Sequence, residues 1–470
     1  MQQMASLLPL CLPLLTLLAP TAALSSGASV SATQLLHVHW PVGSGPIFTS
    51  GGVTRHAASS PTAVFAQFLN SPVEVTAYNA SSGGQPIWTL PHPASDSSKT
   101  FFTSASARHA FDGGGAEGAV DTIALFADYE WPSQCTLYGL ATSGAGAYGP
   151  QGGVVWRTSI PDCSDYGEWG QQRAIDWADD GSLAVVQLFL SGDTGNRTNL
   201  LLGLNGSTGQ ELWRAEMAPN SGGYGVMVAD GGGWVVTGVD TSTSKVNRSA
   251  HVLNALTGQE RAQAYLYWNI PPGISAGGEY LVGGGSASVL LYAWSEALGN
   301  YTLVAEARPP PSEGIHNWLP VDLDVSTYGK QHYIGSTWID LNMTIGRFVA
   351  WDLGALEAGN ATPVCDAVLD SDNGEPDLSI VRASGRYFAV GTWGGYWQHP
   401  EASQYLFVAG TLAPAWNFTS EGGVNGLDLV HTAGGGGGGD TLYVGAAGCG
   451  SFGGAGNGGD AYFWEMAVSE

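Results

Sequence analysis

Short apolar runs that end in a small residue or glycine recur along this chain at a period of about fifty residues. Each run has the length of a strand whose two faces are both covered. The clearest copies are residues 234–238, 280–283, 332–335, 387–391 and 442–445, and weaker copies are residues 64–66, 124–127 and 184–187. The period predicts a fold assembled from stacked copies of one four-stranded unit.

One unit can be followed residue by residue between 171 and 217, where apolar segments alternate with turn residues. Its four strands, named a to d in chain order, are expected at residues 173–177, 183–190, 199–204 and 211–216. A four-stranded sheet that buries both faces cannot be stable alone, whereas a closed ring of such sheets leaves few exposed edges. We therefore expect an all-β fold, a single β-propeller whose blades are these sheets.

The two ends of the chain together supply the final blade of the expected ring. Residues 427–430, 441–445 and 461–466 provide only three strands, and residues 35–40 near the N-terminus provide the missing fourth. Pairing the two ends would close the ring. Counting copies of the second strand favours eight blades; seven is the alternative, because the first two blades are long and loosely patterned.

Residues 204–213, with the sequence Leu-Asn-Gly-Ser-Thr-Gly-Gln-Glu-Leu-Trp, resemble the tryptophan-docking repeat of quinoprotein alcohol dehydrogenase-like propellers. Residues 253–260 share its turn, residues 78–88 share its tryptophan, and residues 152–156 keep only its end. The resemblance implies the propeller fold and, in the dehydrogenases, a pyrroloquinoline quinone cofactor. The family's adjacent-cysteine pair, which covers that cofactor, is absent from this chain and argues against quinone binding.

The N-terminus reads as a secretory signal. Residues 7–18 form an apolar run that contains Pro9 and Pro13 and is too short for a membrane helix, and small residues follow it up to Ala23. No Lys or Arg precedes the run, which departs from the usual signal. We expect cleavage near Ala23, which makes residues 1–23 the signal and residues 24–470 the propeller domain.

Sequons for N-glycosylation agree with export to the extracellular space. Eight asparagines are each followed by a non-proline residue and then Ser or Thr: Asn79, Asn196, Asn205, Asn247, Asn300, Asn342, Asn360 and Asn417. This number exceeds what chance would give. A secreted glycoprotein with no membrane span after signal removal is the expectation.

Composition and charge narrow the class of partner. The 69 glycines, 17 tryptophans and only 12% charged residues suit short strands joined by tight turns. With 40 acidic against 15 basic residues, the formal charge of -25 repels nucleic acid backbones. Solubility outside the cell accounts for this acidity, and a cation-binding surface is the alternative interpretation.

Four cysteines remain once Cys11 leaves with the signal, and they permit three pairings. Cys135 opens the third strand of the second blade and Cys163 follows its fourth strand, so the two ends should lie side by side. A bridge closing this loop of 28 residues would stabilise the fold by about 3 kcal/mol. The pairing of Cys365 and Cys449 stays open.

Candidate binding residues gather in two sets of connections, those from strand d to the next strand a and those from strand b to strand c. These share one face of a propeller, where binding sites collect. Indole rings beside carboxylates suit stacking on sugar faces. The candidates are Trp131, Glu168, Trp169, His316, Trp318, Glu375, Asp377, Trp393 and Trp397. In contrast, strand tryptophans such as Trp88, Trp156, Trp213 and Trp351 are expected to pack between blades.

A weak calcium motif occurs within the connection at residues 370–377. Asp370, Asp372 and Glu375 alternate as hard oxygen ligands, but glycine stands fifth rather than sixth as in the helical calcium loop. An ordinary acidic turn is the alternative interpretation. The chain has no Gly-x-Ser-x-Gly elbow, His-Glu-x-x-His helix or phosphate-binding loop, so no familiar catalytic motif supports an enzyme.

These observations favour a secreted, glycosylated module that binds a protein or polysaccharide partner through the face bearing both sets of connections. The rival hypothesis is an extracellular enzyme, either carbohydrate-active or a quinone-dependent oxidoreductase. An enzyme predicts a deep pocket with close carboxylates at the channel mouth, and a binding module predicts a shallow aromatic surface. A wall or matrix component without a discrete site is a third hypothesis.

Overall fold

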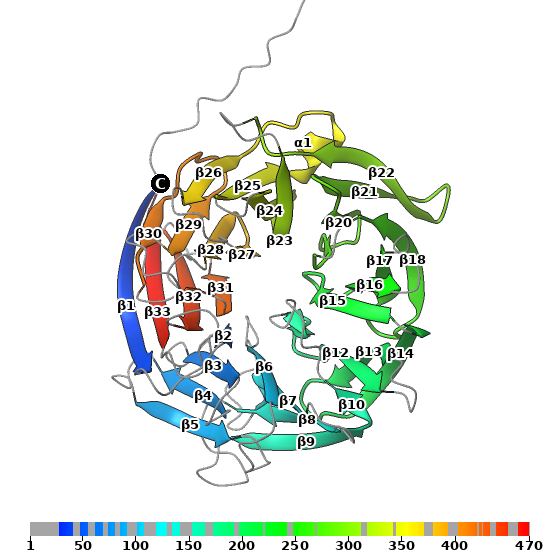
Figure 1. The fold of residues 1–470 in the computed structure, drawn as a ribbon, viewed down its shortest axis with the longest axis vertical. Coiled ribbons are helices and arrows are strands. Elements are labelled where there is room, and N and C mark those ends of the chain that lie inside the picture. The colour runs from blue at the N-terminus through cyan, green and yellow to red at the C-terminus, as the bar shows by residue number, and fades with distance from the viewer. Residues whose placement is uncertain are drawn as a thin grey trace, which may run out of the picture.

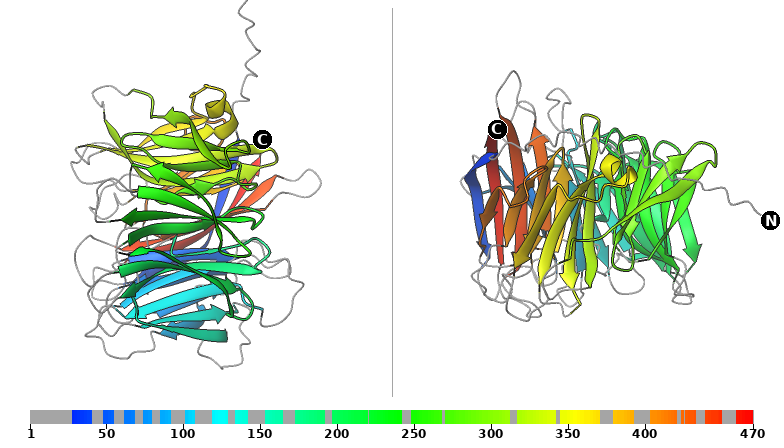
Figure 2. Two further views of the ribbon diagram at one scale, coloured as in Figure 1. Left: turned by 90° about the vertical axis from the view of Figure 1, so that its right-hand side faces the viewer. Right: turned by 90° about the horizontal axis from the view of Figure 1, so that it is seen from above.

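A computed structural model describes most of the propeller. The described residues are 28–40, 48–54, 62–68, 74–79, 85–91, 101–107, 119–128, 134–141, 153–164, 173–191, 197–219, 221–241, 248–267, 270–311, 317–341, 345–370, 379–392, 403–420, 423–424, 426–432, 439–449 and 459–469. They form eight antiparallel sheets arranged around one axis, which confirms the eight-bladed propeller (Figure 1). Seen from the side, the strands run between the two faces of a disc (Figure 2).

Each blade is numbered by its order in the chain, and its strands are given from the axis outward. Blade 1 is β2 (Phe48–Thr54), β3 (Thr62–Phe68), β4 (Glu74–Asn79) and β5 (Pro86–Pro91); blade 2 is β6 (Phe101–Ala107), β7 (Thr122–Asp128), β8 (Gln134–Leu140) and β9 (Val154–Pro161). Blade 3 is β11 (Ile175–Trp177), β12 (Leu183–Ser191), β13 (Arg197–Asn205) and β14 (Glu211–Pro219), with the short β10 (Cys163–Ser164) added to β12. Blade 4 is β15 (Ser221–Val228), β16 (Trp234–Thr241), β17 (Arg248–Asn254) and β18 (Glu260–Leu266).

The second half of the ring repeats this order. Blade 5 is β19 (Gly273–Ile274), β20 (Tyr280–Gly284), β21 (Val289–Ser295) and β22 (Asn300–Ala307); blade 6 is β23 (Trp318–Tyr328), β24 (Gln331–Asp340), β25 (Gly346–Asp352) and β26 (Cys365–Asp370), with the helix α1 (Leu353–Glu357) after β25. Blade 7 is β27 (Ser379–Ser384), β28 (Tyr387–Thr392), β29 (Gln404–Val408) and β30 (Trp416–Phe418). Blade 8 is β31 (Gly426–Thr432), β32 (Asp440–Cys449), β33 (Gly459–Ser469) and, outermost, β1 (Ser29–Trp40).

The ring is closed by the two ends of the chain, as the sequence predicts. β1 pairs antiparallel with β33, from Ser29 opposite Ser469 to Trp40 opposite Gly459. Residues 35–40, which the sequence predicts as the missing strand, form the second half of β1. The strand begins earlier, at Ser29. Because this pairing joins residues that are 440 positions apart, it fixes both ends in one blade.

Neighbouring blades pack face to face, because both faces of each sheet are apolar. In β12 the side chains of Val185 and Val186 point to opposite faces, and both are fully buried. Val186 joins a core cluster with residues of blade 2, and Val185 joins one with residues of blade 4. The near-continuous apolar run of the second strand therefore follows directly from its position between two blades.

The tryptophan-docking repeat joins consecutive blades as the resemblance implies. Trp213 in blade 3 donates its Nε1–H to the carbonyl oxygen of Ala255 in the turn of blade 4, at 2.7 Å. Its ring lies over Gly258, which has a φ of +66°, and a Cβ at Gly258 would come within 2.5 Å of the ring. Trp156 docks in the same way on blade 3, donating to Gly206 at 3.0 Å. Glycine is required in this turn by both its backbone conformation and the ring above it.

The seam between blades 4 and 5 uses a different contact. Ala262 occupies the register position that Trp213 has in blade 3, and Gly299 in the turn of blade 5 has nothing within 4 Å of its missing Cβ. Here the guanidinium of Arg261 lies 4.0 Å from the ring centroid of Trp234 and 3.5 Å from that of Trp294. A cation–π stack thus stands where the docked tryptophan is missing.

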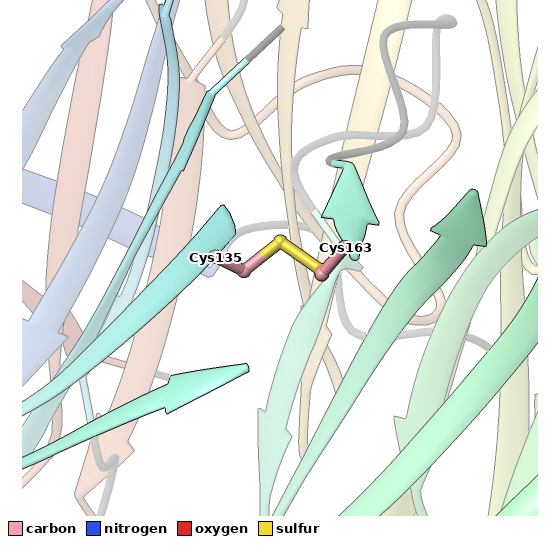
Figure 3. The surroundings of a disulfide bond; sticks show 2 residues. All are labelled: Cys135 and Cys163. Carbon is pink, nitrogen blue, oxygen red and sulfur yellow. A yellow bond between two sulfur atoms is a disulfide. The ribbon is translucent and has the colours of Figure 1, made fainter. Parts of the chain in front are cut away.

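The predicted disulfide between Cys135 and Cys163 is present, with Cα atoms 5.4 Å apart (Figure 3). Its position differs in one respect from the expectation of two adjacent ends within blade 2. Cys163 lies in β10, which pairs with β12 of blade 3, so the bridge links blade 2 to blade 3. Cys365 is a free, fully buried cysteine, and burial raises the pKa of its thiol to about 12. The side chain of Cys449 lies outside the described residues.

Replacing Gly258 by alanine tests tryptophan docking. Gly258→Ala should lower the free energy of unfolding by about 3 kcal/mol, because alanine is strained at positive φ and its methyl group collides with Trp213. Gly299→Ala is the matched control, since φ is +59° and no ring lies above it; it should cost only about 1 kcal/mol. Chemical denaturation of both variants measures the difference, and equal destabilisation would show that the ring contact contributes nothing.

Removing the bridge between blades 2 and 3 tests the disulfide. The double variant Cys135→Ser/Cys163→Ser should be less stable than the parent by about 3 kcal/mol, and a reductant should destabilise the parent to the same extent. The variant should be insensitive to reductant. Cys365→Ser, which removes a buried thiol outside any bridge, should retain the parent's response to reductant. Thermal unfolding with and without reductant provides the measurement.

Candidate functional site

Most of the predicted binding residues lie outside the described part of the chain. These are Trp131, Glu168, Trp169, His316, Glu375, Asp377, Trp393 and Trp397. The ends of the flanking strands are described, and they show that the connections in question all leave from the face where the innermost strands begin. The topology therefore brings those connections to one face, as the sequence predicts, and leaves the contacts of their side chains open.

Trp318 is the one binding candidate whose side chain is described, and it belongs to the interior. It is the first residue of β23, is 4% exposed, and packs in the core between blades 5 and 6. The guanidinium of Arg347 lies 5.4 Å from its ring centroid. Arg347 is in turn held by Asp366 through two hydrogen bonds of 2.7 and 2.8 Å. Trp318 therefore serves packing in this structure rather than offering an exposed ring.

The residues of the calcium hypothesis are also largely outside the described part. Asp370 ends β26 without a described side chain, and Asp372 and Glu375 are not described. Among the described residues, no group of three or more His, Cys, Asp or Glu side chains is arranged to hold a metal ion. The only helix in the described ranges, α1, has five residues, and none there is long and apolar enough to cross a membrane.

Half of the sequons lie in or beside the turns between third and fourth strands. Asn205, Asn300 and Asn360 lie in or beside such turns, and Asn417 lies in β30; the last three are exposed and Asn205 is half-buried. Asn79 ends β4 without a described side chain, and Asn196, Asn247 and Asn342 lie outside the described residues. The four described asparagines are therefore at the rim of the disc rather than in the core.

The central channel contains a group of buried charges that sequence analysis did not identify. Asp176, Asp324 and Asp428 each stand in the middle of an innermost strand, in blades 3, 6 and 8. In each, Oδ1 accepts the backbone N–H of the following residue at 2.9 to 3.0 Å. A repeated local geometry of this kind shows that the three positions are equivalent in their blades.

These carboxylates also connect neighbouring blades. Oδ2 of Asp176 accepts the N–H of Val228 in blade 4 at 2.6 Å, and Oδ2 of Asp324 accepts the N–H of Ala383 in blade 7 at 2.8 Å. Asp322 does the same for Val381 at 3.0 Å. An innermost strand has no further strand to pair with on the channel side, so its N–H groups need other acceptors. The aspartates supply them.

Arg173 crosses the channel from blade 3 to the opposite side of the ring. Its Nη1 lies 3.3 Å from Oδ1 of Asp324 and its Nη2 lies 3.8 Å from Oδ1 of Asp322, both in blade 6. Nη2 also donates to the carbonyl oxygen of Val381 in blade 7, at 3.3 Å. Figure 1 shows β12 of blade 3 and β27 of blade 7 on opposite sides of the axis. One side chain thus ties three blades together.

A second guanidinium, that of Arg382 in blade 7, lies in the same group. Its Nη1 is 3.4 Å from Oδ2 of Asp322 and donates to the carbonyl oxygen of Val381 at 2.7 Å. Burial lowers the pKa of Arg382, and repulsion from Arg173 lowers it further. For Arg173, burial lowers the pKa, but the carboxylates of Asp324, Asp322 and Asp176 outweigh burial and raise it above its ordinary value. Carboxylates therefore compensate the positive charge of Arg173 more fully than that of Arg382.

Beside this network the channel leaves a cavity of about 100 Å³. Its wall comes from six blades and includes Arg173, Arg382, Asp176 and Asp428. Residues of the turns after β11 and β15, such as Asp179, also line it, so it opens toward the face opposite to the predicted binding face. Binding sites for small organic ligands usually measure about 300 to 1,000 Å³, so this cavity suits water or a small ion better.

The described part of the channel does not fit a quinone cofactor. The axis is occupied by the paired charges of Arg173 and Arg382, and the remaining space is small. Cys135 and Cys163 bond to each other across a blade seam, and Cys365 is buried, so none of these three provides a cover for a flat cofactor in the channel.

One sequence signal could have revealed the channel network. An aspartate flanked by apolar residues recurs in the innermost strands, as Ile175-Asp176-Trp177, Leu323-Asp324-Val325 and Leu427-Asp428-Leu429. An isolated carboxylate inside an otherwise apolar strand normally marks a special environment. Arg173 gave no comparable signal, because its partners are more than a hundred residues away in the sequence.

Comparison with known proteins supports the fold. The sequence matches no protein-family model, and no curated protein matches it either. Among solved structures, the quinohemoprotein alcohol dehydrogenase from Comamonas testosteroni is similar with a TM-score of 0.52 at 12% identity, covering 92% of this chain and 76% of that chain. BamB from Moraxella catarrhalis has a TM-score of 0.46 at 13% identity, covering 92% and 97%. The chain thus shares a fold with the dehydrogenase, and at this identity the likeness concerns the fold alone.

Removing the channel cation should destabilise the ring strongly. Arg173→Met should cost about 3 kcal/mol at neutral pH, because it leaves Asp322 and Asp324 buried with less compensating charge.

The matched control is Arg214→Met, which removes an exposed ion pair with Glu211. Because both partners are exposed, the change should alter stability by less than about 1 kcal/mol. Denaturant unfolding of the two variants at neutral pH measures the contrast. Equal destabilisation by the two substitutions would contradict the role assigned to Arg173.

Proposed function

We propose that this chain is a secreted, glycosylated binding module that engages a protein or polysaccharide partner through the face where its innermost strands begin. The observation that carries the proposal is the closure of the described part of the channel by Arg173 and its carboxylate partners. A channel narrowed in this way to a cavity of about 100 Å³ leaves the loops of a face, rather than a deep axial pocket, as the place for contact with a partner.

The hydrogen bonds and ion pairs of the channel carboxylates favour a binding module over an enzyme. Asp322 and Asp324 each accept backbone N–H groups and pair with guanidiniums, and both are less than 10% exposed. A general acid or nucleophile must reach a substrate atom, whereas these oxygens are turned toward protein donors. The described residues therefore support a structural role for them. Glu168, Glu375 and Asp377, the carboxylates that the sequence offers for a glycosidase, lie outside the described part.

The tryptophans of the connections indicate which kind of partner the face could bind. Trp131, Trp169, Trp393 and Trp397 belong to connections that leave from one face, and flat indoles beside carboxylates suit sugar rings or the apolar residues of a protein partner. The formal charge of -25 argues against polyanionic partners. A neutral polysaccharide, or a protein with a basic rim, is therefore the partner that suits this face.

Loss of the loop tryptophans should abolish partner binding. The secreted full chain should bind a subset of immobilised glycans or extracellular proteins, and Trp393→Ala and Trp397→Ala should each weaken that binding about tenfold or more, as expected for buried aromatic contacts. Leu256→Ala is the control, because Leu256 is 80% exposed at a turn on the opposite face. Equal binding by the parent and all variants would refute the aromatic face, and the class of array that responds distinguishes polysaccharide from protein.

The oxidoreductase rival is tested separately. The purified chain is supplied with pyrroloquinoline quinone and calcium, and reduction of an artificial acceptor dye is followed with a panel of alcohols. The proposal expects no turnover above that of the cofactor alone. Turnover that Arg173→Met leaves unchanged would overturn the proposal and place an active site on the face outside the described channel.

A further inference from the structure

The outermost strand of blade 5 is an exposed apolar edge. β22 (Asn300–Ala307) ends its sheet, and its only neighbour in that sheet is β21. Leu303 is 55% exposed and Val304 is 39% exposed, and Leu298 in the preceding turn is 69% exposed. Figure 1 shows β22 at the outer rim of the ring. Among the described residues no strand pairs with the outer side of β22, so its outward-facing backbone groups run beside uncovered apolar side chains.

Such an edge can pair with the same strand of another molecule, and proteins usually prevent this with charges, proline or very short strands. Two other outer strands of this ring have such protection. β14 carries Glu211, Arg214 and Glu216, and β30 contains only three residues. In β22 the first six residues, from Asn300 to Ala305, have no charge and no proline. The one charged residue of the strand, Glu306, lies near its far end and pairs with Arg308, and a bulge falls at Val304.

Asn300 begins this strand and is the first residue of the sequon Asn300-Tyr301-Thr302. Its side chain is exposed, and its Oδ1 accepts the N–H of Tyr301 at 2.8 Å. The Nδ2 group, the atom that N-glycosylation modifies, makes no hydrogen bond to the described residues that would oppose modification. The asparagine is thus within three residues of the exposed side chains of Leu298 and Leu303 along the chain.

We propose that Asn300 carries an N-linked oligosaccharide that shields the apolar edge of β22 and keeps the protein monomeric. The inference rests on the export included in the proposed function. In the modification, Nδ2 attacks the anomeric carbon of a lipid-linked oligosaccharide pyrophosphate. A C–N bond forms, the anomeric C–O bond breaks, the lipid pyrophosphate leaves, and the amide proton passes to a base of the transferase. The attached glycan is bulky and strongly hydrated, so a second strand cannot approach the edge.

The test uses the full chain secreted from a eukaryotic host. Glycopeptide mass spectrometry should find Asn300 modified, and light scattering after size-exclusion chromatography should find a monomer. Asn300→Gln should shift the protein to dimers and larger species while its circular dichroism stays that of the parent. Asn360→Gln is the matched control, because Asn360 is an exposed sequon in a connection outside any strand, and this variant should remain monomeric.

A second variant separates loss of shielding from loss of folding. Asn300→Gln combined with Leu303→Lys places a charge on the edge in place of the glycan and should restore the monomer. An unmodified Asn300, a monomeric Asn300→Gln variant, or equal association of the Asn300→Gln and Asn360→Gln variants would each overturn the inference. Partner binding by the parent is measured independently, so failure here leaves the binding proposal standing, and the reverse also holds.

Discussion

The fold depends on one constraint: each sheet has two apolar faces, and each face must be covered by a neighbouring sheet. Val185 and Val186 show this in adjacent positions, since one packs toward blade 4 and the other toward blade 2. A row of such sheets would leave two uncovered faces at its ends, and only a ring has no ends. The pairing of β1 with β33 is therefore the contact that makes the other seven blades stable, because it completes the blade that lies between the two ends of the row.

Within that constraint, the seams use different contacts for the same purpose. Trp156 and Trp213 each dock on a glycine of the next blade, whereas Arg261 stacks between Trp234 and Trp294 where no docked tryptophan is present. The seam between blades 2 and 3 has a disulfide in addition. Contacts of different chemistry can occupy the rim, because the buried sheet faces provide most of the free energy that holds blades together. The rim contact fixes the angle between blades. This explains why several blades lack the full docking repeat although the period of about fifty residues is kept.

The sequence predicts those parts of the structure that local patterns control. Strands b to d of blade 3 were placed within two or three residues, and the turn ending in Thr208-Gly209 was recognised because its chemistry is contained in ten consecutive residues. The partners of Cys135 and Arg173 depend on how blades sit against each other. The cysteine pairing is confirmed. The pairing of β10 with blade 3 and the channel ion pairs were not predicted, since alternation along one strand says nothing about the neighbouring blade or the far side of a ring.

The channel charges are best understood as a consequence of closure. Eight innermost strands converge on the axis, and each presents backbone N–H groups that no further strand can accept. Asp176, Asp322 and Asp324 satisfy several of these groups, and carboxylates gathered in a narrow space then require cations, which Arg173 and Arg382 provide. Charged side chains on the axis of a propeller can thus serve only to accept hydrogen bonds from the backbone of the innermost strands and to balance one another. A buried Asp–Arg group in such a channel is weak support for a ligand, and the search for function belongs with the loops of the faces.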